Sequence, residues 1–303
     1  MASQEQEQQA GGARYSWGAD EHLFVEVSEE MSLEAYFKAT AMVTALREQQ
    51  LEGVLDVCPA NASYQVRFDP DRLAPRTLEG HLREIEREVG DARDFALHTR
   101  IVEIPVLYDD PWTRETLMRF RDRHQDPDGT DLDYGARVNG FDDAAAFIEA
   151  HHGAPWLASM VGFVAGLPFL YQMVGRPRQL EMPNYLRPRT DTPKLTIGHG
   201  GCFTAIYSVR GAGGYQMFGI TPVPIYDPRG EHAYISDETM CLFRPGDIVK
   251  FKPVDRAAFE AVEAEVASGG FAPRMRPVTF SLDEFNAGID AYNAKLMGVL
   301  NGR

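Results

Sequence analysis

The stretch from His151 to Pro222 constrains the fold of this 303-residue chain most strongly, because glycines recur in it between short apolar runs. It contains GFVAGLPF (Gly162–Phe169) and GHGGCFTAIYSVRGAGGYQMFG (Gly198–Gly219), with RPR (Arg187–Arg189) between them. Glycine permits positive φ and the close approach of other groups to the backbone, and the apolar runs have the length of strands. The stretch therefore predicts a tightly wound β-structure with one lined surface, and not a flexible linker.

The rest of the second half continues this pattern. Strands and turn signals alternate from Met160 to MCLFRPGDIVKFKPV (Met240–Val254), in which RPGD separates two apolar runs. Such alternation indicates an all-β barrel or sandwich over residues 156–303. This domain is expected to end with a helix over AAFEAVEAEVA, a strand at Val278–Phe280 and a closing helix from Leu282.

A smaller α+β domain is predicted over residues 21–107. Ser32 is a good helix N-cap, and Tyr64, Val66 and Phe68 alternate with polar residues as in a strand with one buried face. The expected elements are strands at 22–27, 54–57, 62–68 and 101–107 and helices from Ser32 and from about Thr77. Their order, β-α-β-β-α-β, is that of a ferredoxin-like domain.

The remaining segments are expected to precede or connect these domains. Residues 1–20 lack the basic start and apolar centre of a signal peptide and predict a disordered tail. Residues 108–155 predict a helical bridge, with helices in DDPWTRETLMRFRDRH and FDDAAAFIEAHHG. Between these helices, DPDGTDLD (Asp126–Asp133) lacks the order of an EF-hand loop, which favours a solvated turn.

Charge and cysteine usage limit the partners of the chain. A net charge of −15 argues against a nucleic-acid or anionic-membrane surface, since phosphate binding needs clustered lysines and arginines. No apolar run approaches the length of about 18 residues that a membrane span requires. Cys58, Cys202 and Cys241 are widely spaced and form no CxxC pair, so reduced thiols in a cytoplasmic protein are expected.

Motifs of several enzyme classes are absent from the sequence. It has no GxSxG elbow, no Walker A sequence, no HExxH and no complete GxGxxG, because Gln216 stands where RGAGGYQ needs a third glycine. His151 and His152 are adjacent and His199 is isolated, so no metal site is predicted.

Three polar residues on or beside the glycine-rich stretch each have two interpretations. His199 is either a turn histidine bonded to backbone or a pocket-lining donor or general base, since its unperturbed pKa lies near neutrality. Lys194 and Arg210 either bind a carboxylate or phosphate or are surface charges.

The residues around Tyr215 and Gln216 indicate a cleft. These two side chains follow a pair of glycines and are placed to project into a cleft beside close backbone. Cys202 has no evident partner and is expected to be a small buried hydrophobe. Phe163 and Phe169 are expected in the core.

Three segments of the first half are informative together: CPANASYQVRFDP (Cys58–Pro70), VEIPVLYD (Val102–Asp109) and DLDYGARVNGFDDAAAFIEAHH. In this order they resemble the segment vPAxxSxxvxyDP, the strand leading into the second domain and the helical segment of the carboxyltransferase C/D-type family. This family contains a subunit of 5-oxoprolinase, allophanate hydrolase subunit 1 and a sporulation-kinase inhibitor.

Motifs of the second half follow in the same order, and the resemblance covers residues 23–254. GFVAGLPF resembles GFxPGFPY, Pro188-Arg189 its PR step, GAGGYQMFGITP its SPGGWQLIGRTP, and PGDIVKFKP its PGDxVxFxP.

The resemblance implies an α+β protein with a ferredoxin-like N-terminal domain and a cyclophilin-like β-barrel domain. It implies one part of a heteromeric enzyme that shares its active site with a related second subunit and acts on an amide, urea-like or lactam substrate. The expected reaction is ATP-dependent opening of a cyclic amide together with a third subunit. The alternatives are the carboxyl-transferring part of a biotin-dependent carboxylase and a non-catalytic inhibitor of a kinase.

Departures from the family motifs concentrate near the expected site. Ala165 and Ala212 replace prolines, Leu167 replaces a phenylalanine, Phe203 replaces a glutamine, and His199 stands at an apolar position. These changes predict a larger or more apolar substrate than 5-oxoproline. The expected catalytic residues are His199, Arg210 and Gln216, and the expected substrate-binding residues are Lys194, Phe203, Gly213, Gly214 and Tyr215.

Overall fold

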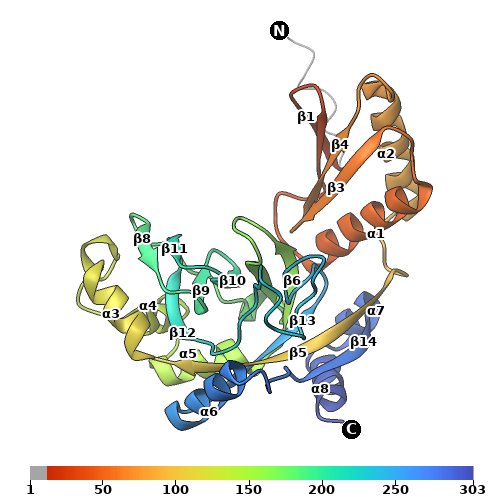
Figure 1. Ribbon diagram of the computed structural model, residues 1–303. Helices are drawn as coiled ribbons and strands as arrows, with labels where there is room; N and C mark the ends of the chain where they lie inside the picture. The colour runs from red at the N-terminus through yellow and green to blue at the C-terminus, as the bar shows by residue number, and fades with distance from the viewer. Residues whose placement is uncertain (1–11, 303) are drawn as a thin grey trace. The chain divides into compact units, whose positions relative to one another are not determined.

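The computed structural model describes residues 12–302, and the chain divides into two compact units between Phe95 and Ala96 (Figure 1). We expected this division near residue 107. It falls earlier because the strand predicted at 101–107 belongs to the second unit. No helix in the described range has the length and apolar character that crossing a bilayer requires.

The first unit is a four-stranded antiparallel sheet in the order β1-β2-β4-β3 with two helices. Its elements are β1 (Arg14–Gly18), β2 (His22–Glu26), α1 (Leu33–Gln49), β3 (Val54–Ala60), β4 (Ser63–Phe68) and α2 (Pro75–Val89). Ser32 caps α1 by accepting a hydrogen bond from the backbone N–H of Ala35, as predicted. The alternation predicted for β4 is also confirmed, since Tyr64, Val66 and Phe68 are fully buried in a core with both helices.

The fourth strand of this sheet is not the predicted one. We expected residues 101–107 to be the last strand of this ferredoxin-like domain. The structure instead adds β1 to the sheet, beside β2, with Arg14 opposite Glu26 and Gly18 opposite His22. Residues 14–18, predicted as part of a tail, are therefore a strand, whereas residues 1–11 lie outside the described residues. An apolar strand does not specify its neighbour, so the sequence did not distinguish the two arrangements.

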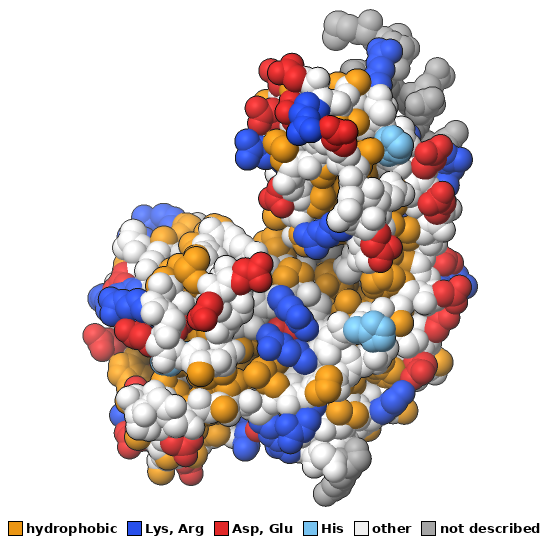
Figure 2. Space-filling view, turned by 45° about the vertical axis from the view of Figure 1, so that its right-hand side comes forward, with side chains coloured by type: hydrophobic (Ala, Val, Ile, Leu, Met, Phe, Trp, Pro, Cys, Tyr) orange, Lys and Arg blue, Asp and Glu red, His pale blue; other side chains and the backbone are white. Residues whose placement is uncertain are grey.

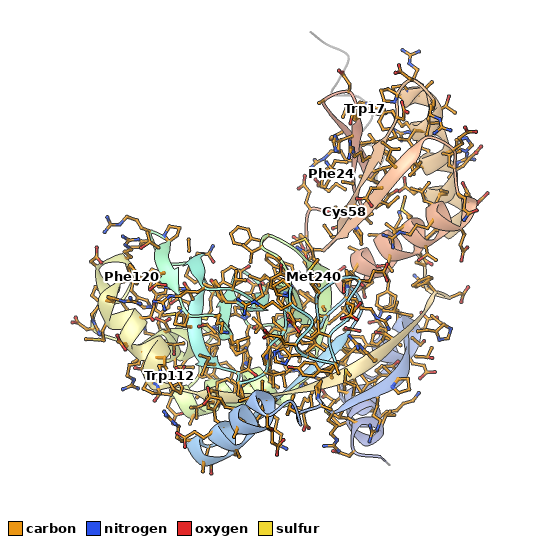
Figure 3. The ribbon with its side chains drawn as sticks, viewed as in Figure 1. Trp17, Phe24, Cys58, Trp112, Phe120 and Met240 are labelled. Carbon is orange, nitrogen blue, oxygen red and sulfur yellow. The ribbon has the colours of Figure 1, made fainter. Side chains whose placement is uncertain are left out.

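The second face of this sheet is polar with one aromatic residue. Phe24 and Cys58 both lie opposite Gln65 of β4, on the face that does not carry the buried residues (Figure 3). Acidic and basic side chains are interspersed over the surface of the first unit in the view of Figure 2.

The second unit combines one large mixed sheet, a two-stranded sheet and several helices. Its strands are β5 (Ala96–Tyr108), β6 (Trp156–Val161), β7 (Pro168–Gln172), β8 (Arg189–Thr192), β9 (Thr196–Gly200), β10 (Phe203–Ile206), β11 (Gly211–Gly213), β12 (Gln216–Ile220), β13 (Ile248–Pro253) and β14 (Met275–Ser281). Its helices are α3 (Pro111–Arg119), α4 (Asp131–Val138), α5 (Ala144–Gly153), α6 (Arg256–Ala267), α7 (Leu282–Ala287) and α8 (Ile289–Leu300), with 3-10 turns η1 (Arg121–Arg123) and η2 (Arg176–Arg178).

The large sheet has the order β12-β9-β10-β7-β6-β13-β5-β14, and pairing of β12 with β5 closes it into a ring. The closure depends on Gly219, which lies opposite Tyr108. A Cβ atom at this position would lie 2.5 Å from the carbonyl oxygen of Leu107, so only glycine fits. The largest core cluster of the unit includes Trp156, Phe218 and Phe251, all fully buried.

The segment predicted as a bridge, residues 108–155, is part of the second unit. It forms α3, η1, α4 and α5, and Trp112 of α3 packs against Phe259 of α6 at a ring separation of 5.5 Å (Figure 3). The expected solvated turn at Asp126–Asp133 is only partly correct. Thr130 and Asp133 form a capping box at the start of α4, but Asp131 is buried and accepts a hydrogen bond from the backbone N–H of Met217 in β12.

Candidate functional site

A pocket of about 520 Å³ lies in the second unit, and its walls are mostly aromatic and apolar. It is lined by Phe163, Leu167, Phe169, Asn184, Tyr185, Pro188, Ala205, Tyr207, Ala212, Gly213, Gly214 and Tyr215. None of these side chains is ionised at neutral pH, and the volume is within the range of small-molecule sites. The pocket is therefore suited to an uncharged or mainly apolar small molecule.

One wall comes from the loop between β6 and β7. Phe163 is 78% exposed and has a φ of 69°, so the loop holds its ring outward instead of placing it in the core as expected. Phe169 is half-buried and also lines the pocket. Leu167, the last residue of this loop, packs with Ala205 and Tyr207. Both phenylalanines are thus pocket residues, which the sequence did not indicate.

Another part of the lining is formed by backbone and tyrosine. The Tyr207 hydroxyl packs directly against Gly213, and a Cβ atom on that residue would collide with it. The same hydroxyl accepts a hydrogen bond from the backbone N–H of Tyr215 at 3.4 Å. Gly213, Gly214 and Tyr215, predicted as substrate-binding residues, accordingly line the pocket.

Two other predicted binding residues lie outside the pocket lining. Lys194 is exposed and is not among the lining residues. Phe203 contacts the pocket only indirectly, with its ring 5.8 Å from that of Phe169. Both follow or precede turns, and their side-chain directions depend on strand register that the sequence leaves open.

Arg210 is engaged in a surface ion pair. Its Nε and Nη2 donate to the two carboxylate oxygens of Asp191 at 2.6 and 2.7 Å, and Arg119 contacts the same carboxylate at 2.9 Å. Hydrogen bonds from Arg210, opposed by burial, lower the pKa of Asp191 to about 2. The structure thus gives Arg210 an acidic partner of its own and does not bring it into the pocket.

Gln216 lies behind the pocket wall and is fully buried. Its side-chain amide donates to the carbonyl of Pro183 at 3.0 Å and to the side-chain oxygen of Gln125 at 3.2 Å. Its Oε1 accepts from Nε2 of His124 at 2.9 Å. Gln216 is therefore part of a buried network and does not line the pocket.

This network extends through Asp131 to the pocket. Nε2 of His124 also lies 3.2 Å from Asp131, and the Tyr185 hydroxyl donates to the same carboxylate at 2.6 Å. Burial alone would lower the pKa of His124, but the hydrogen bond and charge of Asp131 outweigh it and raise that pKa. Burial raises the pKa of Tyr185 strongly, so its hydroxyl stays protonated.

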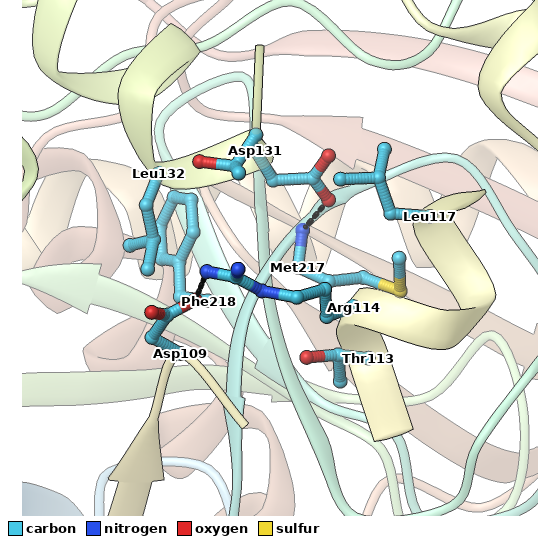
Figure 4. A pocket seen from close by; sticks show the side chains of 9 residues that line it. Asp109, Thr113, Arg114, Leu117, Asp131, Leu132, Met217 and Phe218 are labelled. Carbon is cyan, nitrogen blue, oxygen red and sulfur yellow. Dashed lines mark hydrogen bonds and ion pairs between the residues drawn. The ribbon is translucent and has the colours of Figure 1, made fainter. Parts of the chain in front are cut away.

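The second carboxylate oxygen of Asp131 accepts from the backbone N–H of Met217 at 2.5 Å (Figure 4). It lies beside a cavity of about 20 Å³, which is the size of one water. Asp109 and Arg114 close this cavity with an ion pair of 2.6 Å. The cavity is too small for a substrate, so the larger pocket is the candidate site.

Arg189 lies directly behind the pocket wall. It is fully buried, its Nε donates to the Thr192 hydroxyl at 3.2 Å, and its Cζ lies 4.3 Å from the ring centre of Tyr185. Its two terminal amino groups have no hydrogen-bond partner among the described residues. Gly213, which lies opposite Arg189 in the β8–β11 pair, and Pro188 before it both line the pocket. A buried cation without a partner is costly, so its presence here calls for a group that satisfies it.

His199 lies in the core, and both of its ring nitrogens are bonded. Nε2 is 3.0 and 3.2 Å from the carbonyl oxygens of Leu180 and Gly201, so it carries the proton. Nδ1 then accepts from the Thr204 hydroxyl at 2.8 Å. Burial lowers the pKa of His199 to about 4. A neutral, fully buried ring with these bonds does not reach a substrate, so the structure favours the non-catalytic interpretation of this residue.

The same hydroxyl links His199 to a second buried histidine. Because its proton goes to His199, Thr204 accepts from Nε2 of His151 at 3.0 Å. Nδ1 of His151 accepts from the Tyr108 hydroxyl at 2.8 Å, and burial lowers the pKa of His151 well below its usual value. The tautomers of both His151 and His199 are thus defined by their hydrogen bonds.

The sequence indicated some of these residues only weakly. Arg189 stood in a recognised motif, and Tyr207 belongs to the apolar run TAIY, but neither was singled out. His124, Asp131 and Asn184 carry no local signal, since they are brought to the site from separate loops.

Comparisons with known proteins match most of the chain. Residues 13–235 match the family described as carboxyltransferase domain, subdomain C and D. The chain is 26% identical over 254 residues to a 5-oxoprolinase subunit of Bacillus subtilis (strain 168), covering 81% of this chain and 95% of that protein. It is 23% identical over 297 residues to urea amidolyase of Saccharomyces cerevisiae (strain ATCC 204508 / S288c), covering 95% of this chain and 16% of that protein.

Solved structures show the same fold. The urea amidolyase of K. lactis superposes with a TM-score of 0.81 at 22% identity, covering 96% of this chain and 18% of that one. The urea carboxylase of Kluyveromyces lactis gives 0.80 at 21% identity, covering 96% of this chain and 26% of that one. The chain thus has the mixed α/β fold of a part of these much longer proteins.

Proposed function

The chain belongs to the family of carboxyltransferase domains, subdomains C and D, and on that premise we propose that it is a subunit of a heteromeric, ATP-dependent enzyme acting on a cyclic amide. Its relatives, the 5-oxoprolinase subunit and urea amidolyase, are parts of enzymes. The observation that carries the proposal is the apolar pocket, which has the volume of a small-molecule site and is walled by Gly213, Gly214 and Tyr215.

Asn184 supplies the polar group that an amide substrate needs. Its side chain lines the pocket beside Gly214, at 3.7 Å from the position of a Cβ atom there. No hydrogen bond of this carboxamide is found within residues 12–302, and only the backbone carbonyl of Asn184 accepts one, from Gln125. A carboxamide both donates and accepts, so it is complementary to the C=O and N–H of a lactam.

ATP does not fit this pocket, because no lysine or arginine of the described chain lines it and phosphate binding needs cationic or clustered N–H donors. We therefore propose that a related second subunit, or a third chain, binds ATP and completes the active site. We place the complex in the cytoplasm, in keeping with three cysteines that form no disulfide. We further propose that the ring of strands is a cyclophilin-like barrel, and that the first unit is a ferredoxin-like arrangement altered by β1.

Affinity capture from the native host tests this proposal. The tagged chain is purified, the mass of the intact complex is measured, and ATP-dependent hydrolysis of 5-oxoproline and larger lactams is assayed. We expect a related subunit, a third biotin-free chain and turnover that is lost when Ala212→Trp fills the pocket. Turnover unchanged by Ala212→Trp excludes the pocket as the substrate site, and capture of a histidine kinase alone indicates an inhibitor.

A second candidate function is the carboxyl-transferring part of a biotin-dependent carboxylase acting on an amide or urea-like substrate. It is favoured by the extent of the similarity to urea amidolyase, which covers 95% of this chain against 81% for the 5-oxoprolinase subunit. Biotin carries an activated carboxyl group, and its uncharged ring suits the walls formed by Phe163, Tyr185 and Tyr215. A biotinylated carrier in the captured complex, detected with streptavidin, decides for this function.

A further inference from the structure

The Tyr207 hydroxyl has one hydrogen-bonding capacity that the protein leaves unused. It accepts from the N–H of Tyr215, but it donates to no acceptor within the described part of the chain. Its oxygen lies against Gly213, and both Gly213 and Tyr215 line the pocket. The hydroxyl proton is therefore available at the pocket wall.

A positive charge stands behind this hydroxyl. Arg189 is fully buried and its terminal amino groups have no hydrogen-bond partner in the described chain. Burial raises the pKa of Tyr207, and the positive charge of Arg189 opposes that rise. The cation thus acts on the Tyr207 oxygen and makes its proton a stronger donor.

We propose that Tyr207 binds a carboxylate oxygen of the ligand and that Arg189 is a positioning residue that supplies the positive charge behind it. The inference rests on the proposed function, since it assigns a substrate class to the same pocket. Apart from the carboxamide of Asn184, the rest of the pocket is apolar and largely aromatic. The ligand is therefore a small monocarboxylate with a flat, mainly apolar body, bound with its carboxylate at the Tyr207 end.

The alternative for Arg189 is a purely structural role, and the two roles predict opposite effects on stability. A structural arginine loses stability when it is replaced. A buried cation that is kept for ligand binding behaves differently. An apolar side chain of similar volume can replace it with no loss of stability, because the desolvation cost of the charge disappears. Arg189→Met separates these roles, and Arg189→Lys retains the charge as the conservative variant.

Benzoate and benzamide form a matched pair of probes, since they have the same shape and differ in charge. Each is titrated by calorimetry into the full chain, purified with any subunits it retains. We expect benzoate to bind more tightly than benzamide. Tyr207→Phe should weaken benzoate binding about tenfold or more, as expected for a hydrogen bond to a charged group. Arg189→Met should abolish the preference for benzoate without lowering the melting temperature, and Arg189→Lys should retain part of it.

Ala212→Trp, on the exposed rim of the pocket, is the control and should remove both probes. One outcome overturns the inference and leaves the proposed function standing: the wild type binds benzamide and benzoate equally well, and Ala212→Trp removes the binding. The inference also fails if Tyr207→Phe binds benzoate as the wild type does, if Arg189→Met lowers the melting temperature, or if the wild type binds no benzoate. Benzoate binding that survives Ala212→Trp places the ligand elsewhere and removes the basis of both proposals.

Discussion

Two buried polar clusters of the second unit differ in how completely their hydrogen bonds are satisfied. In the interior cluster, Tyr108, His151, Thr204 and His199 form one chain in which every ring nitrogen has a partner. In the wall cluster, which consists of Arg189, Tyr207 and Tyr215, the terminal amino groups of Arg189 have no partner among residues 12–302. Both are removed from solvent, so burial alone does not separate them. Complete satisfaction is what stability requires, and unused donors indicate where a ligand is needed.

The comparison predicts a large loss of stability in acid, arising from the interior cluster. His151 and His199 have lowered pKa values, the second about 4, so the folded state keeps them neutral while the unfolded state binds protons below pH 6.5. Stability therefore falls as pH falls from about 7.5 to about 5. The loss is about 2 kcal/mol for each histidine, or about 4 kcal/mol in total. Urea unfolding followed by tryptophan fluorescence measures it, since Trp156 lies 5.9 Å from the His199 ring.

The contribution of His124 to stability has the opposite pH dependence. Its pKa is raised, so its contribution is present below pH 6.5 and is lost as pH rises through the folded value. His199→Gln should reduce the acid loss by about half, whereas His124→Asn should make it steeper. Stability that is flat between pH 6.5 and 5 in the wild type contradicts the assignment of two neutral buried histidines.

Removing a hydrogen bond of the interior cluster at constant pH should lower the free energy of unfolding slightly less than acid does. Thr204→Val keeps the shape of the side chain and removes the hydroxyl that links His151 to His199. It leaves one buried donor and one buried acceptor unsatisfied, so we expect the free energy of unfolding to fall by about 3 kcal/mol. Denaturant titration at pH 7.5 checks this, with Thr279→Val on the exposed end of β14 as a control. A loss no greater than that of the control shows that the hydroxyl does not hold the cluster together.

The fold was predictable for elements with one buried face, because their apolar residues recur with the period of a helix or a strand. The helices of the first unit and the strand carrying Tyr64, Val66 and Phe68 were recognised by periodicity. Strand partners were not, because β5 is apolar on both faces and nothing local fixes its neighbour. This is why residues 101–107 were assigned to the first unit.

The sequence predicted only the part of the site that is formed by glycine backbone. Gly213, Gly214 and Tyr215 were found because consecutive glycines signal a close approach. His199 was misleading, since a histidine between glycines has the same signature whether its ring enters a pocket or the core. Arg189 was missed because the absence of a partner is a property of three-dimensional packing that no local pattern records.

Replacing Asp131, whose two carboxylate oxygens both accept hydrogen bonds, should lower the free energy of unfolding by an amount between the effects at Thr204 and at Tyr207. Asp131 accepts from the Tyr185 hydroxyl and from the N–H of Met217. Asparagine has one acceptor oxygen, so Asp131→Asn leaves one donor unpaired and should cost about 2 kcal/mol. The pKa of His124 should also fall, since Asp131 is what raises it against burial. Histidine NMR titration measures the shift, and an unchanged pKa would falsify the coupling between these two residues.

The smallest stability effect is expected at Tyr207, and it gives the sharpest contrast with Thr204. Tyr207→Phe also deletes a buried hydroxyl, but that hydroxyl only accepts one long bond of 3.4 Å from Tyr215 and donates to nothing in the described chain. We therefore expect the free energy of unfolding to change by less than about 0.5 kcal/mol, against about 3 kcal/mol for Thr204→Val. Both variants are measured by the same denaturant titration at pH 7.5. Equal losses from the two deletions would mean that the Tyr207 proton is already used inside the protein, and the distinction between a saturated core cluster and an unsaturated pocket wall would disappear.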